Sequence, residues 1–251
     1  MFEFFKETYY VMWGDLKFMR HNVLNILIGS VMSPLLYLIA FGLGLGMVVD
    51  NVDGIPYIAF IIPGIVALTS LSASFSATST RMNVQRLYYR SFDEMIMCPL
   101  SASSVIIGKS MLGVIRGIFS TSIIFIIGLV LAPDNFHLSL MYIVCILISC
   151  FTFSLLGVAA ALLAKSHQSM ATFSSLVVLP MTFLCGTFFS VDNLNPVFQA
   201  ILYVLPLTHT SVTVRAATLG GDFPWISLIV LVCFGIAFYL INLYLIANKK
   251  V

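Results

Sequence analysis

Three residues in the stretch SSVIIGKSML (103–112) are of the types that close a nucleotide-binding loop: Gly108, Lys109 and Ser110. Such a loop wraps a phosphate with backbone N–H groups, and it needs a glycine five residues before the Gly-Lys pair. That position is Ser103, and a long apolar stretch follows. The fragment therefore does not predict an ATP site in this chain, and Lys109 needs another explanation.

Other patterns that carry chemistry are also missing from the sequence. It contains no HExxH pair, no nucleophile elbow and no cluster of acidic residues suited to a catalytic metal. The five cysteines show no metal-ligand spacing, so we expect small, buried apolar side chains without a disulfide framework. The histidines are dispersed: His21, His137, His167 and His209. We therefore expect a chain that is not an enzyme and binds no cofactor or metal itself.

The composition is that of an integral membrane protein. Hydrophobic residues make up 60% of the chain, charged residues only 9%, and the mean hydropathy is +1.06. Soluble domains are about 25% charged, and so few charges could not cover a soluble surface of this size. The net charge of +2 is too small to indicate a nucleic-acid partner. Since the N-terminus lacks the features of a cleaved signal peptide, we expect the first span to direct insertion.

Six apolar stretches are long enough to cross a bilayer as helices, near 23–49, 57–80, 105–132, 138–164, 169–190 and 223–247. The predicted fold is an all-α membrane domain (1–251) with six transmembrane helices. Its parts are an interfacial helix (1–22), spans 1 and 2 (23–80), a cytoplasmic loop (81–104), spans 3 to 5 (105–190), an extracytoplasmic re-entrant segment (191–222), and span 6 with its tail (223–251).

The distribution of charge predicts the orientation. Basic residues gather on one side of the predicted spans: Lys6, Lys17, Arg20, Arg81, Arg86, Arg90, Lys165, Lys249 and Lys250. The loops on the other side carry Asp50, Asp53, Asp134, Asp192 and Asp222, with Arg215 as the exception. By the positive-inside rule, both termini and the 81–104 loop face the cytoplasm of a cell (inner or plasma) membrane. No carboxylate falls within a span, which argues against a proton-coupled carrier.

The segment before span 1 has the spacing of an amphipathic helix. Its apolar residues recur every three or four positions: Phe2, Phe5, Tyr9, Met12, Leu16 and Met19. We expect this helix to lie in the cytoplasmic headgroup region, either as a plain anchor or as an element that also contacts a cytosolic partner.

Two cations stand at the start of span 3. Lys109 and Arg116 are seven residues apart and share a helical face. We expect Lys109 to extend to the interface, and Arg116, two turns deeper, to face a protein or water-filled interior. The pair could anchor the helix or belong to a transport path.

The cytoplasmic loop contains a short helix in the stretch SFDEMIMCP. Ser91 can cap its start, Glu94 three residues later would complete a capping box, and Pro99 ends it. The helix would present Phe92, Met95, Ile96 and Met97 beside charges. It could lie on the membrane surface or dock into a groove of another protein.

Span 2 and the segment before span 6 are also unusual. The run TSLSASFSATST (69–80) places hydroxyls around span 2, where they could allow tight helix packing or form a polar wall for an amphiphilic substrate. We single out Ser70, Ser74 and Thr78. Residues 191–222 predict short helices packed against protein, broken at Pro206. His209 and Arg215 could contact anionic headgroups there or be satisfied locally.

Two stretches give a specific resemblance. Residues 90–117, RSFDEMIMCPLSASSVIIGKSMLGVIRG, are similar to the cytoplasmic coupling region of the type-2 export permeases of ABC transporters. The order of residue types matches at Arg90, Ser91, Asp93, Glu94, Met95, Ile96, Pro99 and Ser101. Residues 180–209 resemble span 5 of that family and the segment after it. Some members have a Gly-Thr pair in place of Arg90 and Ser91, and a glutamate in place of Asp93.

The resemblance implies an exporter subunit that works with two cytosolic ABC ATPase subunits and a second permease copy, as a homodimer. ATP and Mg²⁺ would bind to the ATPase. The implied coupling residues are Arg90, Ser91, Phe92, Asp93, Glu94, Met95, Met97 and Pro99. The implied pathway candidates are Ser70, Ser74, Thr78, Arg116, Phe188 and Phe189, the last two near an outer neck.

The implied cargo is amphipathic: a lipid-linked glycan, a lipid or a hydrophobic drug. The alternatives are an ATP-independent channel or secondary carrier, and a non-transporting scaffold.

Overall fold

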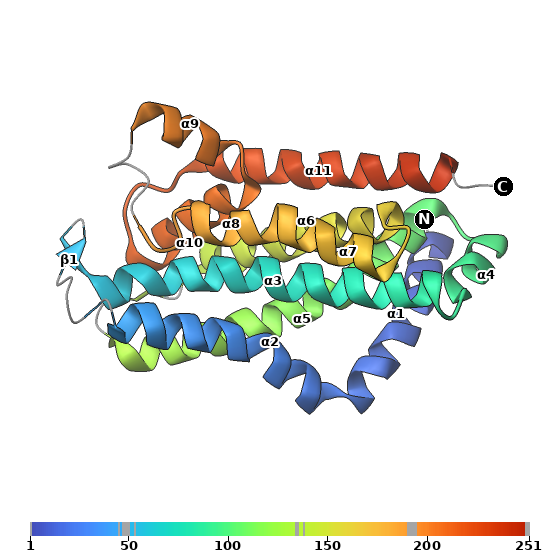
Figure 1. Cartoon of the computed structure of the whole chain (residues 1–251), viewed down its shortest axis with the longest axis horizontal. Coiled ribbons are helices and arrows are strands. Elements are labelled where there is room, and N and C mark those ends of the chain that lie inside the picture. The colour runs from blue at the N-terminus through green and yellow to red at the C-terminus, as the bar shows by residue number, and fades with distance from the viewer. Residues whose placement is uncertain are drawn as a thin grey trace.

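The computed structural model describes residues 2–44, 46, 51–52, 54–133, 136–137, 139–189 and 195–248. Its frame consists of four long helices that run side by side along the molecule, α3 (Tyr57–Leu87), α5 (Ala102–Leu131), α6 (Leu140–Leu163) and α11 (Trp225–Asn248) (Figure 1). These are the four helices of the described chain that are individually long and apolar enough to cross a membrane. They confirm predicted spans 2, 3, 4 and 6.

The predicted first and fifth spans are shorter and interrupted. The first is α2 (Val23–Tyr37), continued by a π-helical segment Leu38–Gly44, and within it only Ile28–Gly42 counts as a short apolar helix. The fifth is α7 (His167–Phe173), a π-helical segment Ser174–Val178 and α8 (Leu179–Leu184). Pro34 lies inside α2, where it removes a backbone donor. The prediction of six complete spans is therefore only partly confirmed.

The segment before α11 is bent, as the sequence predicts. Helices α9 (Pro196–Tyr203) and α10 (Pro206–Leu219) meet at 95°, which makes them a broken span or a re-entrant loop. Asn195 caps α9 and Pro206 begins α10. Arg215 donates to the Gly186 carbonyl at 3.1 Å and stacks over the Phe60 ring. With four or five candidate spans, the fold is a helical membrane protein.

The two ends of the bundle differ. One end, called here the basic end, carries α1 (Phe2–His21), α4 (Ser91–Met97) and the last residues of α11 (Figure 1). The other end carries α9 and a two-residue antiparallel hairpin, β1 (Asn51–Val52) and β2 (Ile55–Pro56), which the all-α prediction missed. Of the charges used for orientation, Asp50, Asp53, Asp134, Asp192, Lys249 and Lys250 lie outside the described residues.

Helix α3 is the core of the molecule, because it is buried along most of its length between α5 and α6. Glycines make this close approach possible. A Cβ on Gly113 would collide with the Ser74 carbonyl and the Thr78 and Ser154 hydroxyls, and one on Gly157 would meet the Phe75 carbonyl. Small residues are the usual means of close helix packing in membranes.

We predict that Gly113→Ala destabilises the protein by about 1–3 kcal/mol, because overpacking against a backbone carbonyl forces the helices apart. The matched control is Gly29→Ala in α2, where an added Cβ meets nothing within 4 Å. That control should be neutral or mildly stabilising, since alanine is the better helix former. Thermal unfolding in detergent micelles measures both, and a Gly113→Ala variant as stable as the control would contradict the packing argument.

Candidate functional site

The chain that connects α3 to α5 forms helix α4 at the basic end. This helix begins directly after a residue with left-handed backbone conformation. Arg90 has φ of 54° and occupies the N-cap position, so the chain reverses sharply after α3. The predicted capping box is wrong: Ser91 lies inside the helix, and its hydroxyl donates to the Gln85 carbonyl at 3.5 Å. Left-handed backbone is the conformation that glycine adopts without strain, so an arginine at this position is unusual.

One side of α4 is fixed to the bundle. Phe92 is only 1% exposed and lies in a core cluster with Met82, Val105, Leu155 and Ile246, which come from α3, α5, α6 and α11. All four long helices therefore contribute to the cluster in which this ring is buried. Phe92 is an anchor within this subunit and does not present its ring to a partner.

The other side of α4 is open. Arg90, Asp93, Glu94, Met97 and Pro99 are exposed, and the Met97 side chain is 85% exposed. Ser91 and Met95 are half-buried. The structure adds Tyr88 and Tyr89, an exposed edge-to-face pair with ring centroids 5.0 Å apart, which sequence reasoning did not single out. The signal was present, since two adjacent tyrosines in a charged loop are candidates for an interface. Together these residues form what we call the coupling face.

A buried ionic network ties α1 to the bundle close to α4. The Asp15 carboxylate of α1, 1% exposed, contacts Lys109 Nζ of α5 at 2.8 Å and Arg81 Nε of α3 at 3.1 Å. Gln85 of α3 completes it, donating to Asp15 at 2.8 Å and accepting from Lys109 at 2.8 Å. Three helices thus share one buried carboxylate.

The network corrects the prediction for Lys109. The side chain does not extend to the interface but is only 4% exposed, because Asp15 and Gln85 satisfy its ammonium inside the protein. The predicted apolar stripe of α1 is only partly exposed: Phe5 and Tyr9 are exposed, as is the neighbouring Trp13, whereas Met12, Leu16 and Met19 are half-buried.

Two further contacts hold the coupling region. Glu7 of α1 accepts a hydrogen bond from the Ser101 N–H at 3.1 Å, at the start of α5, and this bond holds the pKa of Glu7 below its usual value. Arg86 Nη1 donates to the Ala161, Leu162 and Ala164 carbonyls at the end of α6. A guanidinium at this position satisfies carbonyls that the helix leaves unpaired. Its positive charge also interacts favourably with the negative end of the α6 helix dipole.

The predicted pathway hydroxyls lie inside helix contacts. Ser70, Ser74 and Thr78 are buried, and the Thr78 and Ser154 hydroxyls are 2.7 Å apart. The opposite side of α3 is open. Ser76 and Thr80 are exposed and line a cavity of about 410 Å³, which Arg116 also lines, and Ser72 and Ser76 line a second one of about 290 Å³ facing α8. We call the two cavities, which share Ser76, the α3 cleft.

At the other end of the bundle, Phe188 belongs to an aromatic cluster. Its ring centroid is 4.4 Å from that of Phe41 and 6.2 Å from that of Phe183, and Tyr37 lies beside all three. Phe189 is half-buried next to it. Helix α8 and the π-helical segment after α2 thus meet through aromatic rings.

Comparison with known proteins decides the family. Residues 6–219 match the ABC-2 type transporter family. The chain belongs to this family. It is 30% identical to nodulation protein J of Neorhizobium galegae over 203 residues, which are 80% of this chain and 77% of that protein. It is 28% identical to the inner membrane transport permease YadH of Escherichia coli K12 over 236 residues, 93% of this chain and 91% of that protein.

Membership fixes the chain's general role. It is an ABC transporter permease, a multi-pass protein of the inner membrane, and it is not catalytic. A permease of this class implies an ATPase partner. The 103–110 fragment lacks the first glycine of a nucleotide-binding loop, and the structure gives its lysine a different role. The Lys109 ammonium pairs with the buried Asp15 carboxylate.

We predict that Asp15→Ala lowers the free energy of unfolding by about 3–5 kcal/mol, because it leaves the buried Lys109 ammonium without a counter-charge. Adding Lys109→Met should recover a large part of that loss. Equilibrium unfolding of the two single variants and the double variant measures the coupling, with exposed Glu94→Ala as control. Strictly additive losses would show that the two groups do not depend on each other.

Proposed function

We propose that this chain is the membrane subunit of an ATP-driven exporter of amphipathic molecules, and that α4 is where the ATPase acts on it. The observation that carries the proposal is the two-sided nature of α4. Its outer side offers carboxylates and an exposed methionine, while Phe92 on its inner side is buried in a core cluster to which all four long helices contribute. A force applied to the coupling face would therefore act on a helix that is packed into the core of the bundle.

In this proposal the basic end faces the cytoplasm, with both termini on that side, as the positive-inside rule requires. Helix α2 with its π-helical extension, and α7 with α8, cross the membrane as two further spans, giving six. Two copies of an ABC ATPase bind ATP and Mg²⁺ and dock on the coupling faces of two permease copies, which pair as a homodimer.

The α3 cleft is the proposed pathway wall. It combines the hydroxyls of Ser72 and Ser76 with apolar side chains such as Leu68 and Leu179, which suits a molecule that is polar at one end and apolar at the other. A second copy across α2 and α8 would enclose it, with Phe188 near its outer closure. Ser70, Ser74 and Thr78 then act by holding α3 against α5 and α6.

The cargo belongs to the class of lipid-linked glycans, lipids or hydrophobic drugs. An ATP-independent channel or carrier would leave the coupling face without an occupant. Recovery of the chain with a stoichiometric ATPase supports export, and a solitary, fully active chain counts against it.

We predict that Asp93→Lys and Glu94→Lys reduce ATPase recovery on co-purification several-fold, because both carboxylates are exposed on the coupling face. The melting temperature of the permease itself should not change. Asp222→Lys is the matched control, since it reverses an exposed acid outside the coupling face. Unchanged yield and unchanged substrate-stimulated ATP turnover in both variants would reject the assignment of α4.

A second prediction concerns the cleft. In a Cys98→Ser/Cys233→Ser background, which removes the exposed cysteines among those described, Ser76→Cys should react with a water-soluble maleimide in membrane vesicles. Ser70→Cys should stay unmodified, because that position is fully buried. The Ser76→Cys rate should differ between nucleotide-free and ATP-bound transporter. Equal, nucleotide-independent rates at the two positions would contradict a pathway along α3.

A further inference from the structure

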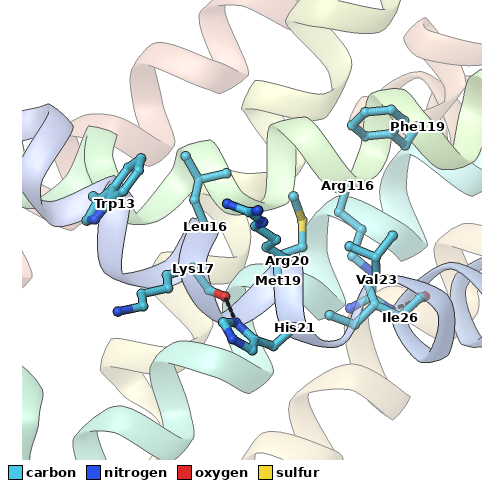
Figure 2. Close-up of a pocket in the computed structure, with 10 residues that line it drawn as sticks. All are labelled: Trp13, Leu16, Lys17, Met19, Arg20, His21, Val23, Ile26, Arg116 and Phe119. Carbon is cyan, nitrogen blue, oxygen red and sulfur yellow. Dashed lines mark hydrogen bonds between the residues drawn. The ribbon is translucent and has the colours of Figure 1, made fainter.

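A third cavity lies at the elbow between α1 and α2 and adjoins the α3 cleft, with which it shares Arg116. It has a volume of about 700 Å³ and is lined by the last turns of α1, the first turns of α2 and two residues of α5, Arg116 and Phe119 (Figure 2). Nothing in the proposed export cycle requires a cavity here. We call it the elbow pocket.

The elbow pocket is positively charged. Lys17, Arg20 and Arg116 contribute three cations, His21 adds a titratable ring, and no acidic side chain lines it among the described residues. The ion pairs found in the described chain both belong to Asp15, which is already shared by Lys109 and Arg81. The cations of the pocket therefore lack an internal counter-charge.

Arg116 is the central group of this site. It lies partly buried on α5, where its Nε donates to the Ser30 hydroxyl and its Nη2 to the Ile26 carbonyl at 3.5 Å. Both acceptors are neutral. A guanidinium has five donors and binds phosphate in a bidentate manner, so Arg116 can still engage an anion from the pocket side.

The rest of the lining is mainly apolar. Trp13 and Phe119 stand at opposite ends of the pocket in Figure 2 and are each more than half exposed. Tryptophan prefers the membrane–water interface, so the exposed Trp13 suits a pocket at the surface of the membrane. A soluble anion would use the cations but would leave this apolar surface uncovered.

We propose that the elbow pocket binds an acidic phospholipid of the cytoplasmic leaflet. Its phosphate contacts Arg20 and Arg116, and its acyl chains lie along Trp13 and Phe119. Basic pockets between membrane helices on the cytoplasmic side have this preference, and each nearby cation strengthens the attraction to an anionic surface. The lipid supplies the counter-charge that Arg116 lacks and holds α1 and α2 at their elbow.

The test uses Trp13 as a reporter. Trp13 and Trp225 are the two tryptophans of the chain, and Trp225 begins α11 at the other end of the bundle, so Trp225→Phe leaves Trp13 as the sole tryptophan. The full permease chain is placed in phosphatidylcholine vesicles without its ATPase, so that Trp13 is the only tryptophan in the sample. A minor fraction of lipid then carries brominated chains, as phosphatidylglycerol in one sample and phosphatidylcholine in the other. We expect brominated phosphatidylglycerol to quench Trp13 several-fold more strongly.

Variants distinguish binding in the elbow pocket from a general attraction between positive charge and anionic lipid. Arg116→Gln should bring the two quenching efficiencies to equality, and Arg20→Gln, at an exposed position that leaves the fold undisturbed, should do so in large part. Lys165→Gln removes an exposed positive charge away from the pocket and should keep the full preference. Equal quenching by both lipids in the parent protein would overturn the proposal, as would an unchanged preference in both arginine variants.

A further arm identifies the source of the phosphate. If millimolar inorganic phosphate displaces the brominated phosphatidylglycerol, the pocket recognises a soluble anion and the lipid assignment is wrong. If it does not, the acyl chains are part of the recognition. Neither arm measures ATP turnover or transport, so failure of this proposal and failure of the export proposal are distinguishable.

Discussion

The basic end of the molecule depends on one buried carboxylate. Asp15 is the only acidic group facing Lys109 and Arg81 in the described network, and it arrives from α1, a helix that would otherwise lie loosely on the membrane. Removing Asp15 leaves the Lys109 ammonium without a counter-charge in a low-dielectric interior, which costs several kcal/mol. The chain therefore fixes α1 to α3 and α5 with an interaction that tolerates little displacement, directly beside the helix proposed to meet the ATPase.

The centre of the bundle follows a different rule. In lipid there is little hydrophobic force between helices, so close contact of small residues has to hold α3 against α5 and α6. Gly113 and Gly157 permit that approach, and the Thr78–Ser154 hydroxyl pair satisfies itself within it. Hydroxyls on one side of α3 serve packing for this reason, and those on the other side, such as Ser76, remain available to the cleft.

Sequence reasoning could predict the membrane class, the four long spans, the short helix after α3 and the bend at Pro206. Each of these depends on composition, local periodicity, proline or charge. Asp15 could not be placed, because its partners lie 66 and 94 residues away and its own helix looks simply amphipathic. The predicted capping box at the start of α4 was wrong, because the helix begins after a left-handed backbone turn at Arg90 and has no side-chain cap. The hydroxyl run surrounds α3, so periodicity alone could not tell the packed side from the open side.

These constraints decide which parts of the subunit can move relative to one another. Helices α1, α3 and α5 share the Asp15 network, and Phe92 joins α4 to a core cluster to which α3, α5, α6 and α11 contribute. Helix α2 and the α7–α8 pair pack against these helices less extensively, and each is accompanied by a π-helical segment, a form that is frequent at functional sites. Those two interrupted helices border the α3 cleft. In the proposed export cycle, this less extensively packed wall is therefore the part of the subunit expected to move, because the packing of α3 against α5 and α6 leaves little room for displacement.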